Sequence, residues 1–264
     1  MNIPLLGLGT WGMGGRLERD ESNKQESIQA LKTGLDLGFR LIDTAEIYAQ
    51  GLSEEIVGEA IKNYQRQNIF ITTKVWQGNL HYKNVLSAAK QSLARLQTNY
   101  VDLYLIHWPN ENIPLSESMS ALEKLVDNGL VKHIGVSNFS VDLMQKAQKC
   151  LDHTKISANQ IEYNLINRSA EQVIIPFCKQ NDIKVIAYCP LAKGALTDNN
   201  SNNKTLQLLA VKYKKTPTQI ALNWLISQNI VAIPKAINRT HMEENLGALG
   251  WKLERGDVKG LKKI

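Results

Sequence analysis

The chain has 264 residues, of which 43% are hydrophobic and 21% charged, and its formal net charge is +6. This length allows one large domain or two small ones. No apolar run is long enough to span a membrane, and residues 1–4 lack the features of a secretory signal. The three cysteines, Cys150, Cys178 and Cys189, are not spaced as zinc ligands or as a disulfide framework. We therefore expect a cytoplasmic protein with no metal site and no membrane partner.

The positive charge is spread along the chain rather than gathered in one basic region. Its largest local excesses are residues 212–215 and 259–263. The basic residues as a whole lack the interleaved aromatic side chains that stack on bases, so we expect no nucleic-acid partner. The charge indicates a solvated surface, or a long-range attraction for an anionic cofactor.

Eight short apolar runs are typical of buried strands, and they lie at residues 5–8, 41–42, 69–73, 101–106, 134–136, 157–161, 184–187 and 230–233. The stretches between them carry apolar residues at helical spacing, such as Ile28, Leu31 and Leu35. Ser53 and the pair Thr216-Pro217 are typical of helix starts. Strand and helix alternating eight times predict an α/β fold, a single-domain (β/α)₈ TIM barrel over residues 1–264.

Each expected strand is followed by a residue that can bind a ligand or take part in chemistry. In chain order these residues are Thr10 and Trp11, Asp43, Lys74, His107, Ser137 and Asn138, Gln160, Tyr188, and Lys235. The catalytic groups of a barrel come from the C-terminal ends of several strands, so we expect these side chains to share one rim. The polar run at 198–203 is then either part of a lid over this rim or an idle surface loop.

Three of these residues, Asp43, Lys74 and His107, form a proton-handling set with Tyr48, which comes shortly after Asp43. An ammonium beside a phenol favours the phenolate, so we expect Lys74 to lower the pKa of Tyr48 from about 10 toward the working pH. Tyr48 would then act as a general acid in carbonyl reduction. Taken singly, Asp43 is explained by a turn, Lys74 by a surface or Schiff-base lysine, and His107 by a core histidine.

Residues 7–12 match the pattern G-x-G-x-x-G and are followed by an acidic residue, Asp43. A Rossmann site needs its last glycine at the start of a helix and the acidic residue about 20 positions further on. Here a loop rich in glycine and charge follows, the helix begins only near Ser22, and Asp43 is too distant. The Rossmann alternative is therefore disfavoured.

Six segments together resemble the aldo-keto reductase superfamily, in that family's order from Leu6 to about Asn245. They are GLGTW (7–11), LIDTA (41–45) with Tyr48, TKVW (73–76), DLYLIHWP (102–109), GVSNF (135–139) and IPK (233–235). The resemblance implies a barrel that binds NADPH, with NADH as an alternative. It makes Tyr48 the proton donor, places Lys74 and Asp43 beside it to tune its pKa, and assigns the orientation of the substrate carbonyl to His107.

The resemblance also implies a set of binding residues. Ser137, Asn138 and Gln160 would hydrogen-bond the nicotinamide carboxamide, Tyr188 would stack on the ring, and Lys235 would pair with the 2′-phosphate. The other cofactor positions are Gly9, Thr10, Trp11, Asp43, Pro190, Leu191, Ala236, Asn238, His241, Glu244 and Asn245. The substrate pocket would be lined by Trp11, Tyr48, Trp76, His107 and Trp108. Without the surrounding matches, Tyr188 is better explained as a half-buried core residue.

Several positions depart from the family's pattern. Cys189 replaces a serine, Ala236 replaces a hydroxyl residue, and His241 replaces an arginine for which Arg239 would compensate. The segment before the first strand is short, which would expose the barrel floor. Few residues follow about position 249, so we expect an open pocket with broad specificity for small carbonyl compounds.

Two other functions remain as alternatives. One is a non-catalytic NADP(H)-binding subunit that senses redox state on the same fold. The other is a Schiff-base lyase that uses Lys74. We expect the protein to be a monomer or a weak homo-oligomer.

Overall fold

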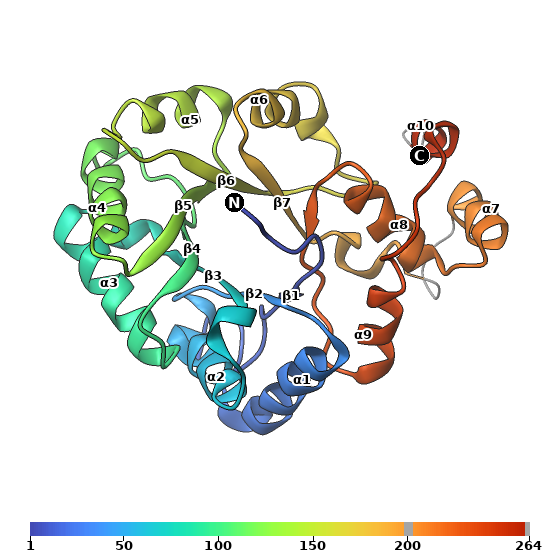
Figure 1. Cartoon of the computed structure of the whole chain (residues 1–264), viewed down its shortest axis with the longest axis horizontal. Coiled ribbons are helices and arrows are strands. Elements are labelled where there is room, and N and C mark those ends of the chain that lie inside the picture. Colours follow the sequence, from blue (N-terminus) through green and yellow to red (C-terminus); the bar gives the residue numbers. More distant parts are fainter. Residues whose placement is uncertain (198–202, 262–264) are drawn as a thin grey trace.

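Eight parallel strands follow one another around a ring in the computed structural model, which describes residues 1–197 and 203–261 (Figure 1). The strands are β1 (Leu8–Gly9), β2 (Leu41–Asp43), β3 (Phe70–Val75), β4 (Val101–Ile106), β5 (Val131–Ser137), β6 (Ile156–Glu162), β7 (Lys184–Tyr188) and β8 (Val231–Ala232). Each strand pairs with the next one in the sequence. This order is that of a (β/α)₈ barrel, as predicted, and it excludes the reversal of strand order that defines a Rossmann sheet.

Backbone hydrogen bonds between the first and the last strand close the ring. Gly7 N donates to Ala232 O over 2.9 Å, Ala232 N donates to Leu5 O over 2.9 Å, and Gly9 N donates to Pro234 O over 3.1 Å. The first strand was predicted at 5–8, whereas β1 begins at Leu8, where pairing with β2 starts. The residues before it bond to β8 instead and serve to close the barrel.

Helices surround the strands in Figure 1. They are α1 (Lys24–Leu37), α2 (Leu52–Ile61), α3 (Tyr82–Arg95), α4 (Leu115–Asp127), α5 (Val141–Gln148), α6 (Ile174–Gln180), α7 (Lys204–Tyr213), α8 (Pro217–Ile226), α9 (Arg239–Leu246) and α10 (Arg255–Leu261). The apolar spacing seen in the sequence predicts their buried faces: Ile28, Leu31 and Leu35 of α1 are all buried.

One of the two predicted helix starts is confirmed and the other is wrong. Thr216 caps α8 by accepting a hydrogen bond from Gln219 N, and Pro217 occupies the first turn. Ser53 does not cap α2, which begins one residue earlier after Gly51. Its hydroxyl is buried and donates instead to Thr10 Oγ1 over 2.8 Å, so it stabilises the loop after β1.

The floor of the barrel is covered, contrary to the expectation that a short N-terminal segment would expose it. The N-terminus lies over the centre of the ring in Figure 1. Ile3 is only 6% exposed and packs with Leu103 and Ile186 inside the barrel, and Met1 and Leu5 pack against the same cluster. A few apolar residues are therefore enough to seal this end of the core.

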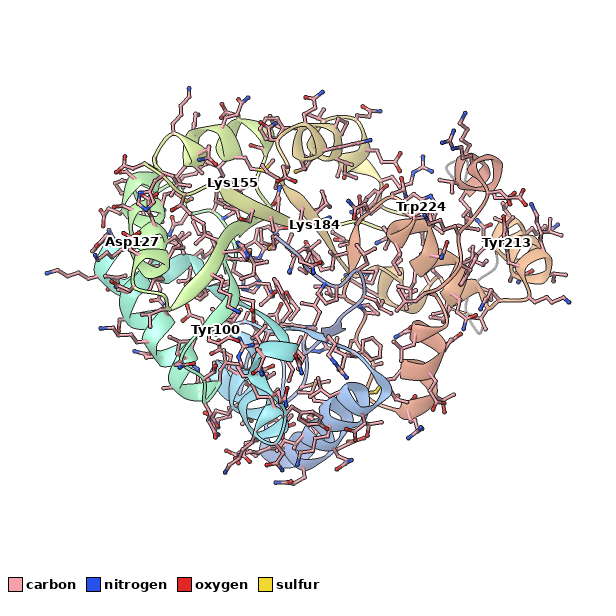
Figure 2. All side chains as sticks on the ribbon, viewed as in Figure 1. Tyr100, Asp127, Lys155, Lys184, Tyr213 and Trp224 are labelled. Carbon is pink, nitrogen blue, oxygen red and sulfur yellow. The ribbon has the colours of Figure 1, made fainter. Side chains whose placement is uncertain are left out.

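The last described helix, α10, packs at the outer edge of the molecule against α7 (Figure 1). Figure 2 shows Tyr213 at this edge, where its ring lies beside that of Trp251, while Trp224 lies further inward and is fully buried. Of the predicted lid at 198–203, only Asn203 is within the described residues, and it caps α7 by accepting from Leu206 N. The lid itself lies outside the described residues and stays a prediction.

Candidate active site

A cavity of about 1320 Å³ opens at the C-terminal ends of the strands. The predicted residues that line it are Gly9, Thr10, Trp11, Asp43, Tyr48, Trp76, His107, Trp108, Ser137, Asn138, Gln160, Tyr188, Pro190, Leu191, Lys235, His241, Glu244 and Asn245. Three predicted residues do not line it: Lys74, Ala236 and Asn238. Residues far apart in the sequence therefore meet at one rim, because parallel strands of a barrel end on the same side.

Lys74 lies behind the cavity wall and is completely buried. Its Nζ is 2.6 Å from Asp43 Oδ1, 2.8 Å from Thr44 O and 3.4 Å from Tyr48 Oη. Burial alone would lower the pKa of Lys74, but the charge of Asp43 and the hydrogen bonds to Asp43 and Tyr48 outweigh burial, so its pKa is raised. Lys74 is therefore a fixed cation beside the phenol and not a surface lysine.

The pKa of Tyr48 is raised rather than lowered, so the prediction of its direction was wrong. Burial of the phenol raises it, and the nearby ammonium of Lys74 only partly opposes that effect. The phenol consequently keeps its proton near neutral pH. Tyr48 is thus poised to donate a proton, with a cation 3.4 Å from its oxygen that would stabilise the phenolate left behind.

His107 is neutral at this site. It is 9% exposed, and burial, together with the charge of Lys74, lowers its pKa to about 2. Its ring lies edge-on to Tyr48 at 5.5 Å and to Trp76 at 5.6 Å between centroids. Its Nδ1 is buried and has no hydrogen-bond partner within residues 1–197 and 203–261, so it is not a satisfied core histidine.

Asp43 connects the catalytic side of the cavity to the opposite side. Its second carboxylate oxygen accepts from Gln160 Nε2 over 2.7 Å. Its backbone oxygen accepts from the buried hydroxyl of Thr10, which in turn accepts from Ser53. These bonds fix the carboxylate that faces Lys74, so Asp43 is more than a turn residue.

Ser137, Asn138 and Tyr188 form a polar cluster across the cavity. Asn138 Nδ2 donates to Ser137 Oγ over 3.0 Å, and Ser137 Oγ donates to Gln160 O over 3.0 Å. Tyr188 Oη donates to Asn138 Oδ1 over 3.0 Å. Asn138 has a left-handed backbone with φ of 62°, which its short polar side chain tolerates. Amide and hydroxyl groups beside an aromatic face suit a flat ring that carries a carboxamide.

A cationic region lies at the other end of the cavity. Lys235 lies beside Gly12, whose φ is 87°, and its Nζ is 2.9 Å from where a Cβ would stand on that glycine. Burial and the nearby guanidinium of Arg16 lower the pKa of Lys235. Asn238 lies away from the cavity and caps α9 by accepting from His241 N, and Ala236 is buried beneath this region. Neither Lys235 nor Arg16 forms an ion pair within the described residues, so this region favours an anionic ligand.

Several further residues that the sequence does not predict line the cavity: Leu17, Ile47, Lys193, Gly194, Thr197, Thr216, Thr218, Gln219, Ile233, Pro234, Thr240 and Glu243. Cys189, which departs from the family's pattern, lines it as well. Most belong to the loops or helix starts that follow β1, β7 and β8. Their place in the chain is a signal, but polar loop residues have no distinctive pattern. Thr218 has a buried hydroxyl without a partner in the described part of the chain, which fits a ligand contact.

Trp11, Trp76 and Trp108 stand at the mouth of the cavity beside Tyr48 and His107. Trp11 lies edge-on to Tyr48, with centroids 4.9 Å apart, and both Trp11 and Trp108 are 41% exposed. None of residues 246–261 lines the cavity. The mouth is therefore apolar, aromatic and open.

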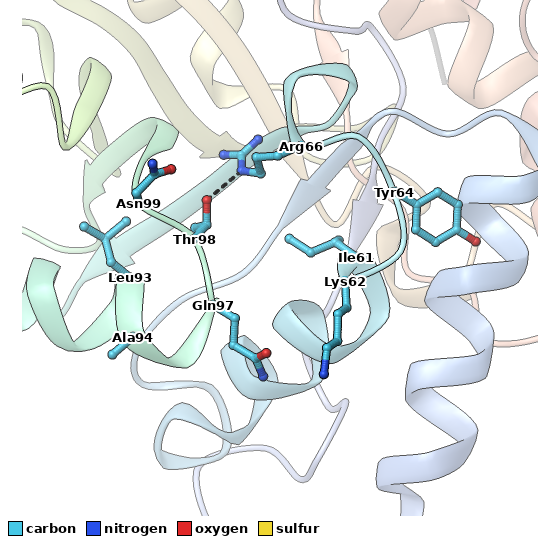
Figure 3. A pocket seen from close by; sticks show the side chains of 9 residues that line it. All are labelled: Ile61, Lys62, Tyr64, Arg66, Leu93, Ala94, Gln97, Thr98 and Asn99. Carbon is cyan, nitrogen blue, oxygen red and sulfur yellow. Dashed lines mark hydrogen bonds between the residues drawn. The ribbon is translucent and has the colours of Figure 1, made fainter.

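A second, smaller hollow of about 520 Å³ lies at the opposite end of β3 and β4, between the ends of α2 and α3 (Figure 3). Its charged side chains are Lys62 and Arg66, and Arg66 donates to Thr98 and to Asp102. Among the described residues, no group of His, Cys, Asp and Glu side chains could hold a metal ion. No helix in that part of the chain is long and apolar enough to cross a membrane.

Comparisons with known proteins agree with this geometry. The model of the aldo/keto reductase family matches residues 5–264. The chain is 36% identical to a methylglyoxal reductase of Escherichia coli, YeaE, over 265 residues that cover 100% of this chain and 91% of that protein. A thermostable aldo-keto reductase crystallised with the inhibitor epalrestat is 42% identical, with a TM-score of 0.94 and coverage of 99% and 95%.

A third relative carries its cofactor. The aldo-keto reductase of Klebsiella pneumoniae, solved in complex with NADPH, is 35% identical with a TM-score of 0.89, and the match covers 99% of this chain and 90% of that one. The family match over nearly the whole length, the closely similar solved structures and the set of side chains around Lys74 agree. The chain belongs to the aldo/keto reductase family.

Proposed function

We propose that this protein reduces aldehydes and ketones to alcohols with NADPH, and that Tyr48 is the proton donor. The observation that carries the proposal is the position of Lys74 Nζ, which is 2.6 Å from Asp43 Oδ1 and 3.4 Å from Tyr48 Oη. A protonated phenol at a cavity surface, with a buried cation behind it, suits protonation of an oxygen that gains negative charge.

Each residue of the set has a distinct role in the proposed reaction. When bound, NADPH supplies the hydride that adds to the carbonyl carbon. Tyr48 donates its proton to the carbonyl oxygen, and the ammonium of Lys74 stabilises the resulting phenolate. Asp43 keeps Lys74 charged in its buried position. His107 is neutral and keeps one ring N–H, which orients the carbonyl by a hydrogen bond.

The cavity fits the nicotinamide cofactor at both ends. Ser137, Asn138 and Gln160 provide groups for the carboxamide, and Tyr188 provides the aromatic face for the ring. Lys235 provides the cation for the 2′-phosphate, so NADPH is preferred to NADH. The unpartnered hydroxyl of Thr218 and the lining residues Glu244 and Asn245 add polar groups at the α8 and α9 side.

The substrates we propose are small carbonyl compounds, including α-ketoaldehydes, with broad specificity. The open aromatic mouth supports this class, because it offers few polar contacts beyond Tyr48 and His107. The similarity to a methylglyoxal reductase of Escherichia coli supports the dicarbonyl compounds within it.

We further propose that residues 1–264 act as one domain and that the protein is cytoplasmic and a monomer or a weak homo-oligomer. One continuous cluster of buried residues, from Leu6 to Leu261, supports a single domain. Most of the large exposed apolar side chains, such as Leu17 and Val173, lie in separate loops, while Leu208 and Val211 share α7, which supports weak self-association at most.

The geometry disfavours the two alternative functions. A Schiff-base lysine must reach the substrate as a free amine, whereas Lys74 is completely buried, charged and bonded to Asp43. A purely redox-sensing subunit has no need for a proton donor, yet Tyr48 and its supporting residues are all in place at the cavity.

The test is to follow NADPH and NADH oxidation by the native protein with a panel of aldehydes, ketones and dicarbonyls. We expect turnover with several small aldehydes and a higher kcat/KM with NADPH than with NADH. A parallel incubation with substrate and borohydride, without cofactor, should trap no adduct on Lys74. Absence of turnover with every compound and both cofactors would refute the proposal, and a trapped adduct would favour the lyase.

A further inference from the structure

Glu46 belongs to the loop between β2 and Tyr48 but does not line the cavity. Its Oε1 accepts two hydrogen bonds from the loop after β3: one from Trp76 N over 2.6 Å and one from Asn79 Nδ2 over 3.0 Å. Its own N–H donates to Lys74 O over 3.3 Å. One carboxylate therefore joins the loop that carries Tyr48 to the loop that carries Trp76.

The turn that Glu46 holds supports the ring of Trp76. A Cβ on Gly78 would be 3.5 Å from Cδ1 of Trp76, so the backbone of this turn lies against the indole. From the other side, Asn110 Nδ2 donates to Gln77 O over 2.9 Å. The turn is thus fixed between the loops that follow β2 and β4.

The Trp76 ring, so supported, forms one wall of the cavity. It lies edge-on to His107, at 5.6 Å between centroids and an interplanar angle of 83°. A shift of the turn therefore moves an aromatic wall relative to the group that orients the substrate carbonyl. Burial raises the pKa of Glu46, and the hydrogen bonds from Trp76 N and Asn79 Nδ2 only partly oppose that effect.

We propose that Glu46 is a positioning residue that determines which carbonyl substrates fit, because it fixes Trp76 from behind the cavity. The inference rests on the proposed reductase function. It predicts that loss of the Glu46 contacts raises KM for substrates large enough to touch the Trp76 wall. KM for small substrates, cofactor binding and the chemical step should change little.

Two variants separate the hydrogen bonds from the charge. In Glu46→Gln, the amide oxygen can still accept from both Trp76 N and Asn79 Nδ2, while the charge is lost. In Glu46→Leu, a side chain of similar size offers no acceptor, and the N–H of Trp76 loses its partner. We expect Glu46→Gln to keep the native KM values and Glu46→Leu to have a raised KM for the larger substrate.

The measurement is KM and kcat for methylglyoxal and for phenylglyoxal, which share the dicarbonyl group and differ in a methyl or phenyl body. For Glu46→Leu we expect KM for phenylglyoxal to rise about tenfold, because a positioned binding wall is lost. KM for methylglyoxal, both kcat values and the NADPH dissociation constant should stay near native. The same substitution in a Trp76→Ala background should add no further change, because the wall is already absent.

Three results would overturn the inference while native turnover persists. The first is an equal rise in KM for both substrates in Glu46→Leu. The second is a rise in KM for phenylglyoxal in Glu46→Gln as large as in Glu46→Leu. The third is a further rise in KM when Glu46→Leu is added to the Trp76→Ala background. Absence of turnover by the native enzyme with both dicarbonyls and with the wider panel would instead refute the proposed function, so the two failures are distinguishable.

Discussion

A single buried side chain, Lys74, lies between Tyr48, the proposed proton donor, and Asp43, the carboxylate that keeps Lys74 charged. Removing Asp43 would leave the buried charge of Lys74 without compensation, which is strongly unfavourable in the protein interior. The positions of Asp43, Lys74 and His107 are predictable from the sequence, because each follows an apolar strand. The direction of the Tyr48 pKa is not, because it depends on how deeply the phenol is buried compared with its distance to the ammonium.

The low pKa of His107 makes stability depend on pH. Below the ordinary pKa of 6.5, the unfolded chain binds a proton at this position, while the folded chain does not until about pH 2. The unfolded state then binds more protons, so stability falls as the pH falls below 6.5. The native protein should lose up to about 1.4 kcal/mol per pH unit more than His107→Gln in this range. Urea unfolding at a series of pH values measures this, and parallel curves for the two proteins would contradict it.

At the scale of elements, the sequence predicts the number and order of strands well and their ends less well. The apolar run at 101–106 predicts β4 at its observed bounds. In contrast, β5 begins at Val131, before its predicted start, because Lys132 and His133 interrupt the apolar run. The residue pattern of α8, with Thr216 before Pro217, predicts its start. Ser53 has the same kind of pattern, but tertiary contact with Thr10 overrides it. The contacts of Glu46 have no local signal, because they join two loops 30 residues apart.

The cap of α8 gives a prediction at this scale. Thr216 accepts from Gln219 N over 3.2 Å and donates to Glu244 Oε1 over 2.7 Å, so it connects α8 to α9. Thr216→Ala should lower the free energy of unfolding by about 1–2 kcal/mol. Thr33→Ala at a half-buried position of α1 is the control and should change it by less than about 0.5 kcal/mol. Equal midpoints of urea unfolding for the two variants would show that the cap contributes nothing.

At the scale of the whole molecule, one end of the barrel is closed by apolar packing and the opposite end carries the candidate active site. Ile3 and its neighbours seal the floor, while the cavity opens at the other end, between residues that come from every strand. The fold and this polarity follow from the alternation of strands and helices. Among the residues that the sequence did not reveal, Lys193 lies in the connection after β7 and Thr218 in the first turn of α8, and their approach to the cavity depends on the assembled barrel.

Because the cavity is built from both halves of the chain, cofactor binding should stabilise the whole fold. At a concentration about 100 times its dissociation constant, NADPH should add about 3 kcal/mol. This corresponds to a rise in Tm of about 5–10 °C for a domain of this size. Lys235→Met should reduce the rise with NADPH and leave the rise with NADH unchanged, and Lys252→Met is the matched surface control. Thermal unfolding with each cofactor measures this; an equal reduction for both cofactors would place Lys235 away from the 2′-phosphate.

The most direct test of the account is the rate of carbonyl reduction by Tyr48→Phe, which keeps the ring and removes only the donor. Loss of a general acid should lower kcat by a factor of about 10²–10⁴. The NADPH dissociation constant, measured by fluorescence titration, should stay at the native value, since Tyr48 Oη bonds to Lys74 and not to the cofactor-side cluster. Near-native kcat in this variant, with native cofactor binding, would contradict the assignment of Tyr48 as the proton donor.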